Sequence, residues 1–350
     1  MMKGLRKIII WTIMPIALEL VGLLYIDQFY LNAETTFNAM KVDTTVKKEA
    51  NKINVKVSED GKNIGVSYSG NYISYYEDGV IKVVDTSNNK KKEIKIDDNA
   101  KFSSYKWLPD RDIMLIAEKY NDGHNSNYLK FESYNAKKDE KNFLSNDKNK
   151  ELKISLADDK YEVLDMALST ATNVTYVKVG KEGAKSRIYR INVMAQVEET
   201  KYVNCKLGKI AVANKEDKLI YEDTTYNRIR IAGNTNPIAT GENATHYLLA
   251  SDNEDRVYVG NGGNGKVKKI FIGDVKTGKQ EWKILTLEHE TSKNNIYITT
   301  NGKIYINNPS MNVVTELETG KETKYDGTLV QVYNLGVVSN DKGKLIGNLF

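Results

Sequence analysis

The fold is decided by the stretch Ile53–Ile96, INVKVSEDGKNIGVSYSGNYISYYEDGVIKVVDTSNNKKKEIKI. In this stretch Ile, Val and Tyr alternate with polar residues in short runs, which are separated by Asp60-Gly61, Ser69-Gly70 and Asp78-Gly79. Alternation with a period of two between such turn pairs predicts antiparallel strands joined by tight hairpins. Four strands of this kind form a sheet with two apolar faces, and such a sheet is stable only when it packs against further sheets.

Similar units follow along the rest of the chain. The second unit contains KFSSYKWLPD, DIMLIAE and YLKFESY between Lys101 and Tyr134, and later units repeat the order of strand, acidic or Asn turn, apolar strand, turn and strand. A unit of about 40–50 residues with about four strands is typical of a β-propeller blade. After Asn51, no segment has an amphipathic helical period beyond two turns. The sequence therefore predicts an all-β fold, a β-propeller.

The number of blades depends on how the last unit is completed. This unit supplies two strands, in Leu329–Ser339 and Lys344–Phe350. A propeller that does not close keeps an unpaired strand edge, which promotes aggregation. We expect the segment Lys41–Val46 (KVDTTV), which precedes the first unit, to supply the missing outer strand. Six complete blades and one composite blade give seven, although six or eight blades also fit the pattern.

The N-terminus predicts a membrane anchor. Lys3, Arg6 and Lys7 precede the apolar stretch Ile8–Ile26, which contains a single charged residue. As a helix this stretch is about 28 Å long, enough to cross the hydrocarbon core of a bilayer. The positive charges place residues 1–7 in the cytoplasm, residues 8–26 in the membrane, the connector 27–40 outside and the propeller 41–350 beyond it. A cleaved signal peptide is the alternative, but no A-x-A cleavage site follows the apolar stretch.

The single charge in the predicted span is Glu19, near its middle. An ionised acid at this depth costs roughly 2–3 kcal/mol on insertion scales. Glu19 is therefore either protonated or snorkelling in a marginal span, or it makes a polar contact with a second membrane helix. Acids within membranes usually face protein, so Glu19 is our candidate for a contact with a partner.

Composition and charge exclude several classes of protein. The net charge of +5 is spread along the chain, and the densest basic run, Asn89–Lys92, falls at a predicted hairpin turn. This pattern differs from the basic stripe of a nucleic-acid-binding domain, so we expect no nucleic-acid partner. The single cysteine, Cys205, excludes an intramolecular disulfide, and its place in a predicted strand indicates a buried structural thiol. Frequent Lys, Asn and Ile are typical of a bacterial protein from an AT-rich genome.

Three phrases resemble a known family: Ser58–Lys62 (SEDGK), Trp107–Asp110 (WLPD) and Ile270–Gly278 (IFIGDVKTG). They are similar to the blades of TolB-type and dipeptidyl-peptidase-type propellers, which are WD40-like. In that family one strand ends in S-P-D-G-K and another in D-x-x-T/G-G. Here Glu59 stands where the family has Pro. The resemblance covers residues 41–350 and implies a propeller fold, but these motifs shape turns and imply no chemistry.

Motifs for catalysis are incomplete. Gly65-Val-Ser67-Tyr-Ser69 lacks the final Gly of the peptidase motif G-x-S-x-G, and no hydrolase-sized domain follows it. Acidic pairs such as Asp97-Asp98 are numerous and local, so they indicate solvated turns and not the two carboxylates of a glycosidase. We therefore predict no catalytic residue.

Motifs for metal or cofactor binding are incomplete as well. The histidines lie in different units, without metal-ligand spacing, and are expected at the surface or in loops: His124, His246 and His289. The loop Asn121–Asn127 is rich in oxygen ligands, and Asn261–Gly265 is rich in glycine, but both join two strands and are expected to be hairpin loops. We predict no cofactor and no metal site.

Two classes of function fit these observations. The first is a non-catalytic propeller, anchored in the cell membrane, that binds or scaffolds a membrane or cell-envelope protein complex, or a cell-envelope glycan. The second is an extracytoplasmic glycan lyase or hydrolase whose acids converge on the central channel from several blades. Three or more convergent acidic, Arg, Tyr or His side chains at the channel mouth would favour the enzyme, and a channel lined by Ser, Thr and Val would favour the binding module.

Overall fold

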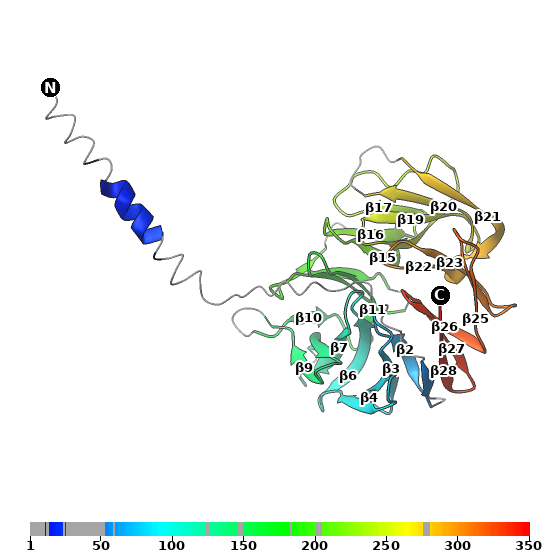
Figure 1. Ribbon diagram of the computed structural model, residues 1–350, viewed down its shortest axis with the longest axis horizontal. Coiled ribbons are helices and arrows are strands. Elements are labelled where there is room, and N and C mark those ends of the chain that lie inside the picture. Colours follow the sequence, from blue (N-terminus) through cyan, green and yellow to red (C-terminus); the bar gives the residue numbers. More distant parts are fainter. Residues whose placement is uncertain are drawn as a thin grey trace, which may run out of the picture. The chain divides into compact units, whose positions relative to one another are not determined.

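The strands form antiparallel sheets around a common centre (Figure 1), seven of them within the part of the chain that the structure describes. This arrangement confirms the predicted β-propeller and its seven blades. The structure is a computed structural model. It describes residues 11, 14–23, 25, 53–58, 60–123, 126–145, 150–182, 184–200, 203, 205–275 and 281–350.

Apart from β1, the blades follow one another along the chain, and the strand named first in each blade below lies nearest the channel. Blade 1 contains β2 (Lys62–Val66), β3 (Tyr72–Glu77), β4 (Val80–Asp85) and β5 (Lys91–Lys95). Blade 2 contains β6 (Ala100–Trp107), β7 (Ile113–Asn121), β8 (Asn127–Asn135), β9 (Glu140–Phe143) and β10 (Lys153–Leu156). Blade 3 contains β11 (Glu162–Ser169), β12 (Val174–Gly180), β13 (Arg187–Ile191) and β14 (Val197–Glu199).

The other four blades complete the ring. Blade 4 contains β15 (Leu207–Ala213), β16 (Lys218–Asp223) and β17 (Arg228–Ile231), and blade 5 contains β18 (Thr245–Ser251), β19 (Arg256–Gly263), β20 (Lys266–Asp274) and β21 (Lys283–Ser292). The short 3-10 helix η2 (Lys293–Asn295) leads into blade 6, with β22 (Ile296–Ile298), β23 (Ile304–Asn308), β24 (Val313–Glu316) and β25 (Glu322–Lys324). Blade 7 contains β26 (Thr328–Tyr333), β27 (Gly336–Asp341), β28 (Lys344–Leu349) and the early strand β1 (Asn54–Lys56).

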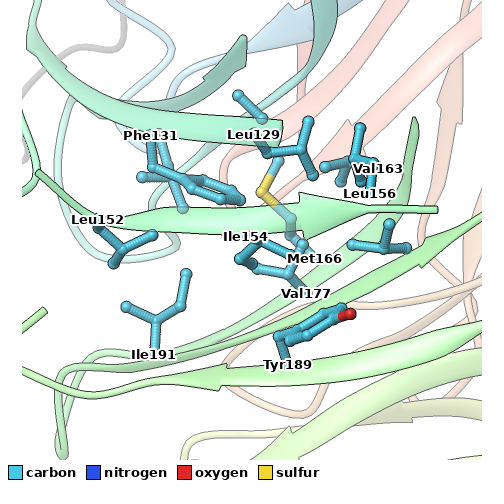
Figure 2. Close-up of a cluster of buried hydrophobic side chains, with 13 residues drawn as sticks. Leu129, Phe131, Leu152, Ile154, Leu156, Val163, Met166, Val177, Tyr189 and Ile191 are labelled. Carbon is cyan, nitrogen blue, oxygen red and sulfur yellow. The ribbon is translucent and has the colours of Figure 1, made fainter. Parts of the chain in front are cut away.

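The core lies between the blades. Both faces of a blade are apolar because alternate residues of each strand point to opposite faces. Each seam between neighbouring blades consequently holds its own cluster of buried side chains in the described residues. The seam between blades 2 and 3 is shown in Figure 2, where Phe131 of β8 and Val177 of β12 contribute to one cluster with Ile154 of β10. The propeller is therefore stabilised by sheet-on-sheet packing and needs no helix.

The hairpins have the geometry that their sequences require. Asp78 and Gly79, between β3 and β4, both have positive φ, as do Asn264 and Gly265 between β19 and β20. Two successive residues of positive φ make a turn whose twist matches that of paired strands, and Asn-Gly and Asp-Gly adopt it at least cost. The predicted hairpin loops at Asn121–Asn127 and Asn261–Gly265 are confirmed, since each joins two strands of one blade.

The ring closes through a composite blade, as predicted, but through a different segment. β1 pairs antiparallel with β28, with Val55 opposite Leu345. The expected segment Lys41–Val46 lies outside the described residues, and the fourth strand of blade 7 is Asn54–Lys56, which we had assigned to the first blade. The physical reason is burial: Ile53, Val55 and Val57 alternate toward the core and are at most 3% exposed. These three side chains fill the seam between blades 7 and 1.

The predicted membrane anchor, residues 8–26, falls partly outside the described residues. Residues 14–23 are helical, and Glu19 lies in this helix with an exposed side chain. Among the residues that the structure describes, no helix is both long enough and apolar enough to cross a membrane. The anchor therefore stays a prediction.

Candidate binding site in the propeller channel

A wide cavity occupies the propeller channel. Its volume is about 780 Å³, and its walls are formed by the inner strands β2, β6, β11 and β26 together with the residues at the end of β22. These strands come from blades 1, 2, 3, 7 and 6, so the cavity exists only once the ring has closed. Its size lies in the range of small-molecule and oligomer binding sites, about 300–1,000 Å³.

The lining of the cavity is mainly polar and uncharged. Hydroxyl and amide side chains come from the walls of blades 1, 2, 6 and 7, whereas β11 of blade 3 contributes none. They are Asn63, Ser67, Ser103, Ser104, Thr299, Thr300, Gln331 and Asn334. Tyr68, at the end of β2, is 42% exposed, and Glu162 is the one carboxylate among the described residues that line the cavity. The lining thus holds four side chains of the types that we associated with an enzyme, Glu162 and three tyrosines, but a single carboxyl group, whereas retaining and inverting glycosidases use two.

Two other tyrosines of the lining have a structural role in the blades. Tyr105 donates a hydrogen bond to the Asn63 carbonyl, and burial raises the pKa of its hydroxyl well above the ordinary value. Tyr333 is 6% exposed, and burial raises its pKa to about 12. Neither hydroxyl is a proton acceptor at neutral pH, so these side chains shape the cavity and do not supply a base.

Lysine side chains cross three consecutive seams on the side of blades 2 to 5. The Nζ of Lys106, on β6, donates to the Met166 carbonyl of β11. Lys178, on β12, donates to the carbonyls of Leu207 (2.9 Å) and Gly208 (2.8 Å). Lys209, on β15, donates to the Leu249 carbonyl of β18. Each ammonium thus ties its blade to the inner strand of the next.

Lys293, in η2, belongs to the same group of charges. Its Nζ lies 4.8 Å from the centroid of the Tyr247 ring and 3.6 Å from Glu222 Oε1. We call Lys106, Lys178, Lys209 and Lys293 the lysine cluster. The carboxylates that interact with them are Asp165, 3.4 Å from Lys106 Nζ, and Glu222.

A second group of charges lies in blade 2, away from the channel. Carboxylate oxygens of Asp97, Glu118 and Glu132 lie within 4.8 Å of one another, and Glu118 and Glu132 are 0% and 2% exposed. Lys141 Nζ, from β9, lies 2.9 Å from Glu118 Oε1 and 2.5 Å from Glu132 Oε2. We call these three acids and Lys141 the carboxylate cluster. Asp97 lies beside a turn, with its side chain 40% exposed, and its Oδ2 also accepts a hydrogen bond from Tyr120 at 2.5 Å, which joins it to the cluster.

The carboxylate cluster has one ammonium for three acids, and this imbalance changes its protonation. Burial raises the pKa of Glu132 to about 7, with a further contribution from the neighbouring Glu118, while Lys141 opposes the shift. The pKa of Tyr120 is raised, first by burial and then by its hydrogen bond to Asp97. The lysine ammonium occupies the position between the acids that a metal ion would need, so the group is an ion-pair network within blade 2.

The remaining sequence candidates have ordinary surroundings. His246 is on β18, with Nε2 2.6 Å from Thr240 Oγ1, and burial lowers its pKa. His246 is thus half-buried in a strand, and our expectation of a surface position was wrong for it. His289 is exposed, and His124 lies outside the described residues.

Cys205 is half-buried in a bend before β15, not in a strand, and burial raises its thiol pKa to about 11. A raised thiol pKa disfavours the reactive thiolate.

Sequence reasoning missed both the lysine cluster and the carboxylate cluster. Their members are separated by tens of residues along the chain and form no motif. The one local signal is a charged residue in an otherwise apolar strand, such as Glu118 in IMLIAEKYN or Lys178 in VTYVKVG. Such a residue must find a partner on a neighbouring strand, because an unpaired buried charge is costly.

No protein-family model matches the chain, and no curated protein matches its sequence. Among solved structures, the chain is similar to a functionally unknown protein from Desulfotomaculum acetoxidans DSM 771, at 14% identity and a TM-score of 0.44, over 76% of this chain and 85% of that one. It is also similar to the WD40 domain of SCAP from fission yeast, at 10% identity and a TM-score of 0.42, over 83% of each chain. These similarities concern the fold, and the seven-bladed architecture itself rests on the strand pairing described above.

Proposed function

We propose that this chain is a non-catalytic binding module, a β-propeller that a single N-terminal membrane helix anchors at the outer side of the cell membrane. The propeller binds or scaffolds a protein or a cell-envelope glycan. The observation that carries this proposal is the channel cavity, which is wide, polar and open to solvent, with Glu162 as the one carboxylate of its described lining. A site of this kind can recognise a ligand by hydrogen bonds, and its described lining offers no pair of carboxyl groups.

The anchor is supported by the side chains of the helical residues. Leu18, Val21 and Leu23 are more than half exposed, as is Trp11 near the predicted cytoplasmic end. Apart from Glu19, the described residues of this helix carry no charge, and lipid tails would cover apolar side chains of this kind better than water. Protease added to intact cells stripped of their wall should digest the propeller. Full protection of the propeller would contradict the proposed topology.

The assignment to the TolB type of propeller rests on the sequence phrases alone and stays a prediction. The same holds for a glycan lyase or hydrolase, the second class of function considered above. The two classes differ in outcome when the purified chain is incubated with a glycan that it binds: a binding module returns the glycan intact, and an enzyme shortens it.

Binding through the channel is tested by crosslinking and pull-down from membranes with a matched pair of variants. Tyr68→Ala removes an exposed ring at the cavity, and Tyr226→Ala removes an exposed ring at the turn between β16 and β17. We expect Tyr68→Ala to reduce the recovery of the partner and Tyr226→Ala to leave it unchanged. Equal recovery with wild type and both variants would contradict binding at the cavity.

A further inference from the structure

The lysine cluster carries more positive charge than its neighbours neutralise. Four ammonium groups interact with two carboxylates, those of Asp165 and Glu222, which leaves a net charge of +2. Lys106 belongs to the lining of the channel cavity, and the charge of Lys106 lowers the pKa of Lys209 across the neighbouring blades, so Lys106 links the cluster to the candidate binding site. Excess charge next to a cavity with low-dielectric walls raises the local concentration of ligands of opposite sign.

Lys209 is the member with the fewest partners. It makes no ion pair with any described residue, and the Leu249 carbonyl accepts one of the three N–H groups of its ammonium. Its side chain is exposed, yet protein surrounds the ammonium closely enough for desolvation and the charge of Lys106 to lower its pKa. An ammonium that is repelled by a second ammonium and has one carbonyl acceptor for its three N–H groups is suited to receive an anion.

We propose that the channel binds an anionic glycan, with one carboxylate or phosphate group of the glycan held between Lys106 and Lys209. This inference rests on the proposed binding function and adds the chemical class of the ligand. The anion supplies the acceptor oxygens that the two ammonium groups lack, and it removes their mutual repulsion. Hydrogen bonds between charged groups are stronger than neutral ones, so this contact contributes most of the preference for a charged ligand.

The lining of the cavity indicates why the ligand is a glycan. A sugar chain presents hydroxyl groups on several sides, and these match the hydroxyl and amide side chains that blades 1, 2, 6 and 7 contribute to the cavity. Gln331 accepts a hydrogen bond from the Val66 amide through Oε1, so its NH₂ group is left to donate. Tyr68 presents an exposed aromatic ring on which a sugar ring can pack. The lysine cluster then selects the charged members of this class.

The test measures binding of soluble probes to the full-length chain in detergent micelles by isothermal titration calorimetry. The anionic probes are a galacturonic acid oligomer, which presents carboxylates, and a phosphorylated mannose oligomer, which presents phosphates. A neutral maltose oligomer of similar length is the control for charge, and polyglutamate of similar length is the control for an acidic protein segment. We expect one anionic probe to bind at least about tenfold more tightly than the neutral oligomer. The tighter of the two identifies the anion.

Variants connect the binding to the two lysines. Lys106→Met and Lys209→Met keep most of the side-chain volume and remove the charge, so each should weaken binding of the anionic probe about tenfold, the loss expected for one charge-assisted hydrogen bond. Lys324→Met, on the outermost strand of blade 6, is the matched control and should bind like wild type. Added salt should weaken the binding of the anionic probe, because the contact is electrostatic.

The outcomes separate this inference from the proposed function. Equal binding of anionic and neutral oligomers, or lysine variants that bind like wild type, would overturn the anion site and leave the binding function intact. Binding of polyglutamate alone would overturn the glycan assignment. Failure of all probes to bind would also overturn the inference. In that case the binding module would still be supported if the pull-down recovers a partner with wild type and loses it with Tyr68→Ala.

Discussion

The carboxylate cluster makes the stability of the propeller depend on pH, and Glu132→Gln tests this. Glu132 is 2% exposed and shares the ammonium of Lys141 with Glu118 and Asp97, while Tyr120 faces the same group. Glutamine has the shape of a protonated glutamic acid and cannot ionise. The substitution therefore keeps the packing of the cluster and removes the titration.

The magnitude follows from the pKa. Burial raises the pKa of Glu132 from 4.5 to about 7 in the folded protein, so between these values the folded chain holds a proton that the unfolded chain releases. The stabilisation from this proton is complete below pH 4.5 and is lost as the pH rises through 7. A shift of this size corresponds to about 3 kcal/mol, and the nearly complete burial of the side chain leaves little solvent screening. Glu132→Gln should thus gain up to about 3 kcal/mol relative to wild type between pH 4.5 and pH 8.

The assay is urea unfolding of the full-length chain in detergent micelles, followed by tryptophan fluorescence, to which Trp107 and Trp282 of the propeller contribute along with Trp11, at intervals from pH 4.5 to pH 8. The control is Glu140→Gln, an exposed residue of β9 outside the carboxylate cluster. Titrations common to all three proteins cancel when each variant is compared with wild type at the same pH. A difference between Glu132→Gln and wild type that stays constant with pH, or that falls as the pH rises, would refute the reasoning.

Three further perturbations test the closure of the ring and the anchor. Gly347→Ala would place a Cβ 2.6 Å from the Cβ of Ile53 and should lower the free energy of unfolding by about 1–3 kcal/mol. Gly263→Ala is the control and should cost far less, because no atom lies within 4 Å of the added Cβ. Equal urea midpoints for the two variants would contradict the close packing at Gly347. Deleting Leu345–Phe350 removes the strand that pairs with β1 and should lower the melting temperature of the whole propeller, so an unchanged calorimetric transition would show that this pairing is dispensable. Glu19→Leu should leave membrane insertion and propeller folding intact but lose a membrane partner, or a second copy of the chain, in a detergent pull-down; identical partner lists would mean that Glu19 is merely tolerated.

The strands and hairpins of this protein were determined by its sequence alone, because both depend on interactions over a few residues. The alternation of Ile, Val and Tyr sets which side chains reach the two faces of a sheet, and pairs such as Asp78-Gly79 adopt the positive φ that a tight hairpin needs. Repetition of this pattern also determined the propeller and the composite blade, since stacked sheets must bury both faces and close their edges.

The segment that closes the ring was decided by tertiary structure. Two candidate strands precede β2 in the sequence, and local pattern does not rank them. The alternation of Ile53, Val55 and Val57 is what fills the seam between blades 7 and 1, and Gly347 leaves the space for Ile53. That fit depends on residues nearly 300 positions apart in the chain, as the register of β1 on β28 shows.

The lysine cluster was likewise decided by tertiary structure, through the packing of neighbouring blades, and the carboxylate cluster by strand pairing within blade 2. Lys106, Lys209 and Lys293 lie on different blades, and nothing in their local sequence distinguishes them from the many other lysines of the chain. Only the packing of neighbouring blades brings their ammonium groups to shared carbonyl and carboxylate partners. Electrostatic interactions act through space and not along the chain, so the charges around the channel follow from the fold, whereas the strands follow from the sequence.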